Sequence, residues 1–560
     1  MDNNHVADFF TLLSKLIDIH GGDGFKSKSY SSAAFAIEKL PVQLTDLPVE
    51  KLSSLKGIGA STSKKITEIL ETGQLKALEE IIFNTPPGVI EMLNIKGIGP
   101  KKIHTIWKEM QIESVGELLY ACQENRLKIY KGFGEKTQQS ISDTIEFYLK
   151  SKDRHLYSQL TLFTEQTTEL LIKIFGDNKV FITGEFKRQL EIIDDLDFVV
   201  NAKEEVIKEK LSAIKEFAPE EKKNGALIYK TSSGVKIRIY YADDKNVMAR
   251  IIETSSSAAF YKEFLRQNIS GIHANQVTEK EVFNNAGFSF IPACLREDPA
   301  ILNIAKADSL PELIQIKDIR GIIHCHSNWS DGTNTIEELA FAAQAKGMEY
   351  LVISDHSKTA FYANGLFEDR IKQQHQYINE LNERLAPFRI FKSIESDILN
   401  DGSLDYGEDI LSSFDMIIAS VHSNLKMTEE KAMKRLIGAI QNPYTTILGH
   451  MTGRLLLSRN GYPVVHKEII DACAANNVII ELNANPRRLD VDWRQIPYAL
   501  KKNVLISIDP DAHFIEGFDD IRFGVLVAQK AMVKPENNFS SFSLSDFEAY
   551  LSHRKKSKGI

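Results

Sequence analysis

Hydrophobic residues follow distinct patterns in different parts of this chain. In Val6–Ile17 they return every three or four positions, which predicts an amphipathic helix. Lys179–Gly184 and Asp195–Val200 are short apolar runs that predict strands. From Gly321 onward, short apolar runs alternate with helical stretches such as Ile336–Ala343. This alternation predicts a parallel sheet closed into a barrel, with functional side chains at the carboxyl ends of its strands.

A Gly-x-Gly pattern recurs three times in the N-terminal part, each time after an apolar residue and close to lysines. Glycine lets the backbone approach a phosphate, and the free N–H groups at the next helix start can receive it. One copy alone is more often an ordinary turn, whereas three copies indicate a repeated motif. The candidate DNA-contacting residues of the three copies are Gly57, Gly59, Lys65, Gly97, Gly99, Lys101, Lys102, Gly132 and Gly134.

Two further candidates lie in the preceding predicted helix. Lys26 and Tyr30 stand one helical turn apart, where they could face a 5′-phosphate together with Lys65. The open alternative is a solvated helix face with ordinary lysines.

Composition limits the class of protein. A chain of 560 residues is too long for one hydrophobic core and predicts several domains. Its net charge of −8 argues against coating nucleic acid by charge alone, but leaves backbone N–H contacts to phosphates open. Four scattered cysteines without a CxxC pattern suggest neither a disulfide framework nor a zinc finger. With no basic leader and no long apolar run, we expect a cytoplasmic protein without a membrane partner.

The densest candidate chemistry lies in Gly321–Gly332. In an extended strand His324 and His326 project from one face and Cys325 from the other, and Asp331 adds a carboxylate from the following loop. A lone histidine is more often an ordinary core or surface residue, but the pattern here recurs at successive strand ends, which indicates a metal site. The later members are His356, His422, His450, Asp511 and His513.

The order of these features, with Gly184–Arg188 and Asp195-Leu-Asp197 between the hairpins and the histidines, resembles a bacterial family X DNA polymerase. In that type the polymerase core is fused to a C-terminal polymerase-and-histidinol-phosphatase (PHP) domain. The resemblance implies a multidomain α+β and α/β fold. Its implied parts are a helix-hairpin-helix domain at 1–85, a fingers-like helical domain at 86–155, a palm and thumb at 156–300, and a distorted (β/α)7 PHP barrel at 318–545.

The resemblance also implies a ligand set and its chemistry. Mixed imidazole and carboxylate donors suit Mn²⁺ best, with Zn²⁺ or iron as alternatives. We expect three ions, with Glu395 as a bridging carboxylate, and hydrolysis of a phosphoester. Arg454, Arg459 and Lys358 are candidate phosphate clamps, with ordinary surface cations as the open alternative. The nine implied ligands are His324, His326, Asp331, His356, Glu395, His422, His450, Asp511 and His513.

The implied polymerase site departs from the family pattern. Asp195 and Asp197 fit two magnesium ligands, but Arg238 occupies the position of the third. Glu185 follows Gly184, where the family has a serine. The first change reverses a charge and the second places an acid where a triphosphate would bind, so they predict weak or lost polymerase activity and argue against Mg²⁺ at the palm. The alternative is a shifted alignment in which Asp243 or Asp244 is the third ligand.

We therefore expect a DNA-repair enzyme that processes 3′ ends as a metal-dependent phosphoesterase and 3′-5′ exonuclease. Its expected substrate is gapped, nicked or 3′-recessed DNA, bound without sequence preference by a bacterial, nucleoid-associated monomer. Cleavage at abasic sites is a further activity that the resemblance implies. The alternatives are an active bifunctional polymerase and exonuclease, a non-catalytic DNA-end scaffold, and a small-molecule phosphatase, which would leave the three hairpins without a role.

Overall fold

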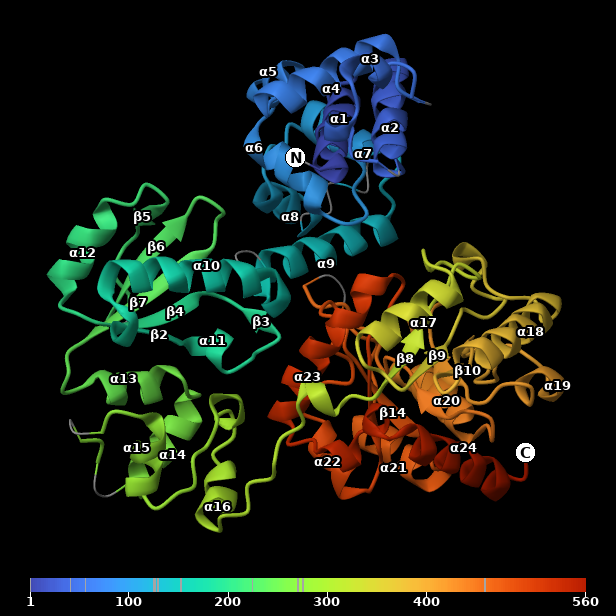
Figure 1. The fold of residues 1–560 in the computed structure, drawn as a ribbon. Coiled ribbons are helices and arrows are strands. Elements are labelled where there is room, and N and C mark those ends of the chain that lie inside the picture. The colour runs from blue at the N-terminus through green and yellow to red at the C-terminus, as the bar shows by residue number, and fades with distance from the viewer. Residues whose placement is uncertain are drawn as a thin grey trace. The chain divides into compact units, whose positions relative to one another are not determined.

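A computed structural model gives the fold as two compact units, Met1–Lys152 and Asp153–Ile560 (Figure 1). None of the helices it describes is long and apolar enough to cross a bilayer. The described residues are 2–40, 42–55, 57–123, 127, 130–151, 154–223, 225–268, 271–273, 276–457 and 460–560.

The N-terminal unit is helical. Its first helix buries Val6, Phe10 and Leu13 at the expected helical spacing. A single core extends from Val6 to Ile145, so the predicted boundary near residue 85 falls inside one compact unit. The helices are α1 (Asn3–Ile19), α2 (Gly24–Glu38), α3 (Val49–Leu52), α4 (Ala60–Thr72), α5 (Lys76–Phe83), α6 (Pro87–Glu91), α7 (Pro100–His104), α8 (Val115–Gln123) and α9 (Glu135–Ser151).

The second unit begins with a five-stranded sheet. Its order is β2 (Val180–Thr183), β4 (Leu196–Asn201), β7 (Lys236–Ala242), β6 (Ala226–Thr231) and β5 (Phe217–Pro219). Only the β4–β7 pair is parallel. Phe198 and Val200 of β4 enter one core and Val199 enters another, as alternation along a strand requires. Two further short strands, β1 (His155–Leu156) and β3 (Ile192–Ile193), pair with each other.

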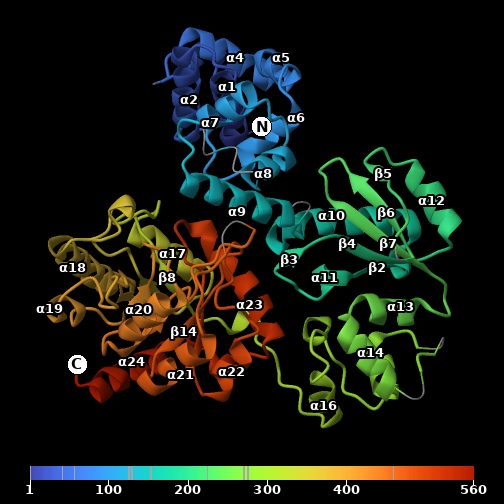
Figure 2. The ribbon, with the colours of Figure 1, turned by 180° about the vertical axis from the view of Figure 1, so that it is seen from behind.

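Helices cover both faces of this sheet (Figure 2). α10 (Tyr157–Phe175) and α12 (Glu204–Ser212) share the core of Phe198 and Val200. The core of Val199 is completed by α13 (Val247–Thr254), α14 (Ala258–Gln267), α15 (Glu279–Asn285) and α16 (Ile301–Lys306). The turn between β2 and β4 contains α11 (Gly184–Lys187).

The C-terminal part is a parallel barrel. Its strands form a three-stranded sheet, β8 to β10, and a five-stranded sheet, β11 to β15, in which every pair is parallel. Bridges from His356 to Glu395 and from Cys325 to Ala512 join the two sheets at both edges. The strands are β8 (Gly321–Cys325), β9 (Tyr350–Ile353), β10 (Arg389–Lys392), β11 (Glu395–Asp397), β12 (Ile418–Ser420), β13 (Ile447–Leu448), β14 (Ile479–Asn483) and β15 (Ile506–Asp509). With β10 and β11 as halves of one interrupted strand, the described strands make the expected distorted (β/α)7 barrel.

Helices surround the strands, and the C-terminal helix closes one end of the barrel (Figure 1). The ring of Phe547 in α24 lies 4.3 Å from that of Tyr350, the first residue of β9, and Phe547 shares a core with Val352 and Ile418. Because α24 covers the amino ends of the strands, their carboxyl ends are left to build a site. The helices are α17 (Ile336–Ala345), α18 (Glu368–Leu385), α19 (Glu408–Leu411), α20 (Glu429–Gln441), α21 (His466–Asn476), α22 (Ile496–Lys501), α23 (Ile521–Lys530) and α24 (Leu544–Lys558).

Candidate metal centre

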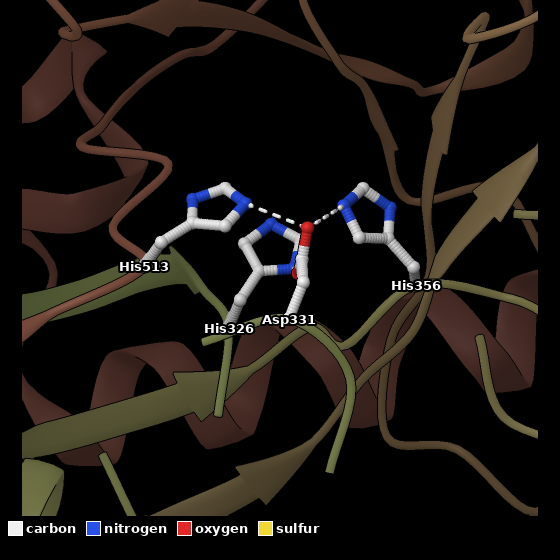
Figure 3. Close-up of side chains that lie close together, drawn as sticks. All are labelled: His326, Asp331, His356 and His513. Atoms are coloured by element: carbon white, nitrogen blue, oxygen red, sulfur yellow. Dashed lines mark ion pairs between the residues drawn. The ribbon is translucent and has the colours of Figure 1, made fainter. Parts of the chain in front are cut away.

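The structure brings all nine predicted ligands together at the carboxyl ends of the barrel strands. Figure 3 shows four of them: His326 and Asp331 come from the segment after β8, and His356 and His513 come from two other segments. Asp331 Oδ2 lies 3.5 Å from His513 Nε2 and 3.6 Å from His356 Nε2. Its carboxylate and the His513 ring are one-third exposed, so this is the side of the centre that solvent reaches.

Glu395 lies at the middle of the centre and is buried. Its Oε1 is 3.3 Å from Nε2 of His324, 3.1 Å from Nε2 of His422 and 3.0 Å from Nε2 of His450. The other oxygen, Oε2, is 3.0 Å from His356 Nδ1 and 3.7 Å from His326 Nε2. The two oxygens therefore face two different sets of imidazoles, which is the arrangement that a bridging carboxylate needs.

Eight of the nine predicted ligands, all except His450, fall into three overlapping groups, each of which could hold one ion. Within a group, all ligand atoms lie within 4.8 Å of one another. The groups are His326, Asp331, His356 and His513; His324, His326 and Asp511; and His356, Glu395 and His422.

The first ligand strand differs from its prediction. We expected His324 and His326 to share a face by plain alternation, but His324 has a φ of +59° and the register of β8 shifts between Ile322 and Cys325. The two rings still face the centre, 5.3 Å apart. Asp511 also has a left-handed backbone, with a φ of +53°. Two ligands thus occupy a strained conformation that the surrounding structure must hold in place.

Acidic residues behind the ligands orient the imidazoles. His324 Nδ1 hydrogen-bonds Glu481, and His422 Nδ1 lies 2.9 Å from Asp397 Oδ1. A hydrogen bond at Nδ1 directs Nε2 of each ring toward the centre. Sequence reasoning assigned these carboxylates no role. The available signal was positional, since Asp397 stands two residues after Glu395 and Glu481 lies in a strand that supplies no ligand.

Asp355 supports the first ligand loop in the same way. This buried carboxylate accepts hydrogen bonds from the Ser327 N–H at 2.8 Å, from the Ser330 hydroxyl at 2.5 Å and from the Gln374 amide at 2.7 Å. These bonds fix the chain between His326 and Asp331.

Buried atoms without hydrogen-bond partners show that the donor set fits metal ions. Both oxygens of Glu395, Nε2 of His324, and both ring nitrogens of His450 have no hydrogen-bond partner. Unsatisfied buried polar atoms are costly, and coordination to a cation would satisfy them. Burial, and then the rings of His356 and His513, lower the pKa of His326 to about 3, which favours the neutral ring that a metal ligand requires.

The predicted phosphate clamps are differently placed. The Arg454 guanidinium donates to the Arg488 carbonyl at 2.9 Å and to Asp492 at 2.8 Å, so it holds the 488–492 loop. Lys358 pairs with Glu368 at 2.7 Å. Arg459 lies outside the described residues. Arg488, which sequence reasoning missed, has its Nε 3.5 Å from the ligand Asp511.

The three glycine turns of the N-terminal unit share one geometry. Gly57, Gly97 and Gly132 have φ of +86°, +89° and +93°, values that favour glycine. Two residues later, Gly59 and Gly99 immediately precede helices α4 and α7, and neither helix start receives a side-chain cap. The first-turn N–H groups are therefore available to an external acceptor.

The other DNA-binding candidates lie near these turns. Gly134 immediately precedes α9. Lys26 and Lys101 are exposed, whereas Lys65 is half-buried and Lys102 Nζ reaches back to the Gly97 carbonyl at 3.3 Å. The Tyr30 ring packs 5.9 Å from that of Phe10, so part of this side chain belongs to the core.

Comparison with known proteins identifies the family. Family models match a helix-hairpin-helix domain at residues 1–75, a SAM-like helix-hairpin-helix tandem at 89–146, and a PHP domain at 323–485. The DNA polymerase/3′-5′ exonuclease PolX of Bacillus subtilis (strain 168) is 31% identical, in a match that covers 98% of this chain and 99% of the relative. The chain belongs to the PolX family. The expected family X and PHP resemblance is thereby confirmed.

Other relatives of this PolX-family chain match a smaller share of it. A probable phosphatase of Caldanaerobacter subterraneus subsp. tengcongensis is 27% identical over 40% of this chain and 88% of the relative. A probable phosphatase of Caldicellulosiruptor bescii is also 27% identical, over 34% of this chain and 78% of the relative.

The polymerase-like site of this PolX-family chain contains a cation between its acids. Asp197 and Arg238 are direct neighbours in the parallel β4–β7 pair. Arg238 forms an ion pair with Asp195, and its Nε is 3.5 Å from Asp197 Oδ1. Burial raises the pKa of Asp197 to about 7, although Arg238 opposes that shift. The site's charge is thus balanced from within the protein.

Glu185 and Gly184 also lie at this site. Glu185 accepts a hydrogen bond from the Asp194 N–H at 2.7 Å, and burial raises its pKa. Gly184 has a φ of +68°, and a Cβ there would come within 2.4 Å of Asp197 Oδ2. Only glycine therefore allows this close approach of backbone to carboxylate.

The alternative third ligands lie at the far end of β4. Asp244 accepts a hydrogen bond from Asn201 at 2.7 Å, and Asp243 caps the turn that follows β7. Asn201 is four residues along the strand from Asp197, which corresponds to about 13 Å. Neither acid shares a site with Asp197.

Proposed function

We propose that this protein is a metal-dependent DNA phosphoesterase that removes nucleotides or blocking phosphates from 3′ ends during repair, as a 3′-5′ exonuclease. One observation carries the proposal: the buried carboxylate of Glu395 stands within 3.7 Å of five histidine rings, with no hydrogen bond to either oxygen. Such a centre requires cations, and a phosphoester is the substrate that they would suit.

The nine predicted ligands would hold up to three ions, with Mn²⁺ first, and Zn²⁺ or iron as alternatives. Bound ions would supply a hydroxide at neutral pH and neutralise charge on the attacked phosphate. Arg488 is the cation best placed to contact a phosphate oxygen, because its guanidinium borders Asp511. Arg454 positions Arg488, because its guanidinium donates a hydrogen bond to the Arg488 carbonyl. Glu481 and Asp397 keep the imidazole nitrogens directed at the ions.

The glycine turns deliver DNA to this chemistry. Backbone N–H groups at the starts of α4, α7 and α9 would bind phosphates without reading bases. Gapped, nicked or 3′-recessed DNA is the proposed substrate, acted on by a monomer associated with the bacterial nucleoid. The name of the PolX relative includes both polymerase and 3′-5′ exonuclease activities, and the second of these is the one that we propose for this chain.

The other activity, template-directed DNA synthesis, is the one that we propose is weak or lost in this chain. A guanidinium cannot ligate Mg²⁺, and Arg238 pairs with the acids that would. The remaining candidate is a bifunctional enzyme, which the PolX relative's name favours. Gap filling with Mg²⁺ or Mn²⁺ and dNTPs separates the two, because robust extension that Asp197→Ala abolishes would establish an active palm.

The exonuclease is tested on a duplex with a recessed, labelled 3′ end and Mn²⁺. His324→Ala and His356→Ala should abolish nucleotide release, whereas digestion at the wild-type rate would refute the assignment. Metal analysis of the purified protein tests the scaffold alternative, which predicts no stoichiometric ion. Competition between duplex DNA and a small phosphomonoester tests the small-molecule phosphatase alternative.

A further inference from the structure

The loop that follows β14 lies between the metal centre and the palm. We define this loop as residues 484–495. Its inner part is held against β14, because Asn483 donates its N–H to the Asp490 carbonyl at 2.7 Å. Arg488 of the same loop has its Nε 3.5 Å from the ligand Asp511. The path of the 484–495 loop therefore sets the position of the proposed phosphate contact.

The outer end of the 484–495 loop contacts the palm. Arg494 Nη1 lies 3.1 Å from Oε1 of Glu191, a palm residue in the turn before β3. The Glu191 side chain is only 8% exposed, so the palm shields its end of this ion pair from solvent. Leu190 of the palm and Leu489 of the loop line the same small cavity. Loop and palm thus meet through one charged and one apolar contact.

Glu191 is fixed in place on the palm side. Its carbonyl accepts a hydrogen bond from the Tyr157 N–H at 3.1 Å, and the Tyr157 side chain packs against both the palm core and the barrel core. A second link is the buried Lys530 of α23, which donates to the Arg188 carbonyl of the palm at 2.8 Å. Because Glu191 is anchored in this way, its carboxylate is a fixed point for the barrel loop.

Alternating charges connect Glu191 to Arg488. Arg494 pairs with Asp492 at 2.9 Å as well as with Glu191. Asp492 pairs in turn with Arg454 at 2.8 Å, and Arg454 donates to the Arg488 carbonyl at 2.9 Å. Members of such a network depend on one another, so removing the first acid should release Arg494 and loosen the bonds that follow it.

We propose that Glu191 of the palm is a positioning residue of the metal centre, which acts through the 484–495 loop to hold Arg488 beside Asp511. The inference rests on the proposed phosphoesterase function. It gives the palm a part in hydrolysis that requires neither a metal ion nor polymerase chemistry at Asp195 and Asp197. Because the effect passes through the protein, it should extend to substrates too small to touch the palm.

The test measures the coupling between Glu191 and Arg488 in the full-length protein with Mn²⁺. Glu191→Gln, Arg488→Ala and the double variant are assayed on the labelled 3′ end and on bis(p-nitrophenyl) phosphate, a phosphodiester without DNA. Glu205→Gln, an exposed acid on the palm helix α12, is the matched control. We expect Glu191→Gln to lower kcat/KM about fivefold on both substrates. In the Arg488→Ala background it should lower kcat/KM by less than about twofold.

A second variant tests the other partner of the ion pair. Arg494→Gln removes a half-exposed cation, and it should reproduce the fivefold loss on both substrates. Metal content should stay at the wild-type level in both single variants. Lost metal would show that Glu191 supports the ligands rather than Arg488, and so would overturn the inference.

The remaining outcomes separate the inference from the proposed function. With active wild-type protein, an equal loss in the Arg488→Ala background would show that Glu191 does not act through Arg488. A loss on DNA alone would show that Glu191 affects DNA binding instead, and wild-type rates on both substrates would show that the ion pair has no role. Each of these results overturns the inference alone. A wild-type protein that cleaves neither substrate refutes the proposed function itself.

Discussion

The palm site and the barrel site both gather buried carboxylates at the ends of strands, yet they balance that charge in opposite ways. In the palm, Asp195 and Asp197 face the guanidinium of Arg238, a permanent cation supplied by the protein. In the barrel, Glu395 and Asp511 face imidazoles, whose nitrogens are themselves electron-pair donors when neutral. The protein supplies a cation in the first arrangement, although Oδ1 of Asp197 has no hydrogen-bond partner; in the second, both oxygens of Glu395 lack such a partner.

This difference shows how a site's counter-charge decides its chemistry. An arginine fixes the acids in one ion-paired geometry, and a cation that replaced it would have to displace a bonded side chain. In the barrel, Nε2 of His450 has no hydrogen-bond partner, so an ion that binds it displaces no bonded side chain. Carboxylates alone do not make a metal site. The residues opposite them decide whether an ion can bind.

We expect the largest effect from Glu395→Gln. This change keeps the side chain's shape but removes the charge that faces five imidazoles, so we expect nucleotide release to fall more than about 100-fold, together with metal content. Inductively coupled plasma analysis and a labelled 3′-end assay measure both. Glu429→Gln, an exposed acid on α20, is the control. Unchanged metal content and rate would refute the central role of Glu395.

Metal removal should destabilise the protein through the barrel alone. When the free ion concentration is about 100 times the Kd, binding stabilises the native state by about 2.7 kcal/mol. A chelator should therefore lower Tm by about 5 to 10 °C. Differential scanning calorimetry measures the shift. Asp197→Ala should respond to the chelator as wild type does, and Glu395→Gln should respond less. A shift that Asp197→Ala abolishes would assign the ions to the palm instead.

Arg488→Ala tests which arginine contacts the phosphate. Loss of a charge-assisted contact should reduce kcat/KM by about tenfold to a hundredfold while metal content stays unchanged. Arg454→Ala should act more weakly and through the 488–492 loop, because its guanidinium bonds that loop. Equal rates for Arg488→Ala and wild type would remove Arg488 from the proposed mechanism.

Arg238→Asp gives the palm a third carboxylate and so tests whether Arg238 prevents metal binding there. We expect template-directed extension to rise at least about tenfold over wild type, because the internal counter-ion becomes a possible ligand. A gap-filling assay with Mg²⁺ measures it. Arg238→Gln removes the cation without adding a carboxylate, so it should gain less. If both variants remain as inactive as wild type, Glu185 or another feature blocks the site.

Much of the site could be predicted from the sequence, because strand ends are local features. Short apolar runs followed by His or Asp-x-His identified His356, His422 and His450 as members of one cluster, and the barrel topology then brought them to one mouth. Glu395 came from the resemblance, and its position between two sets of imidazoles required the structure. The three glycine turns could also be predicted from the sequence, because a left-handed backbone favours glycine.

The order of the elements, the ligand types and the charge reversal at Arg238 follow from the sequence, because each depends on a residue's identity and its near neighbours. Which cations face which site depends on how the chain folds in three dimensions. Arg454 and Arg488 look alike in sequence, yet one holds a loop and the other borders Asp511. That choice depends on the path of the loops between strands, and contacts between residues 23 and 38 positions apart leave no local sequence pattern.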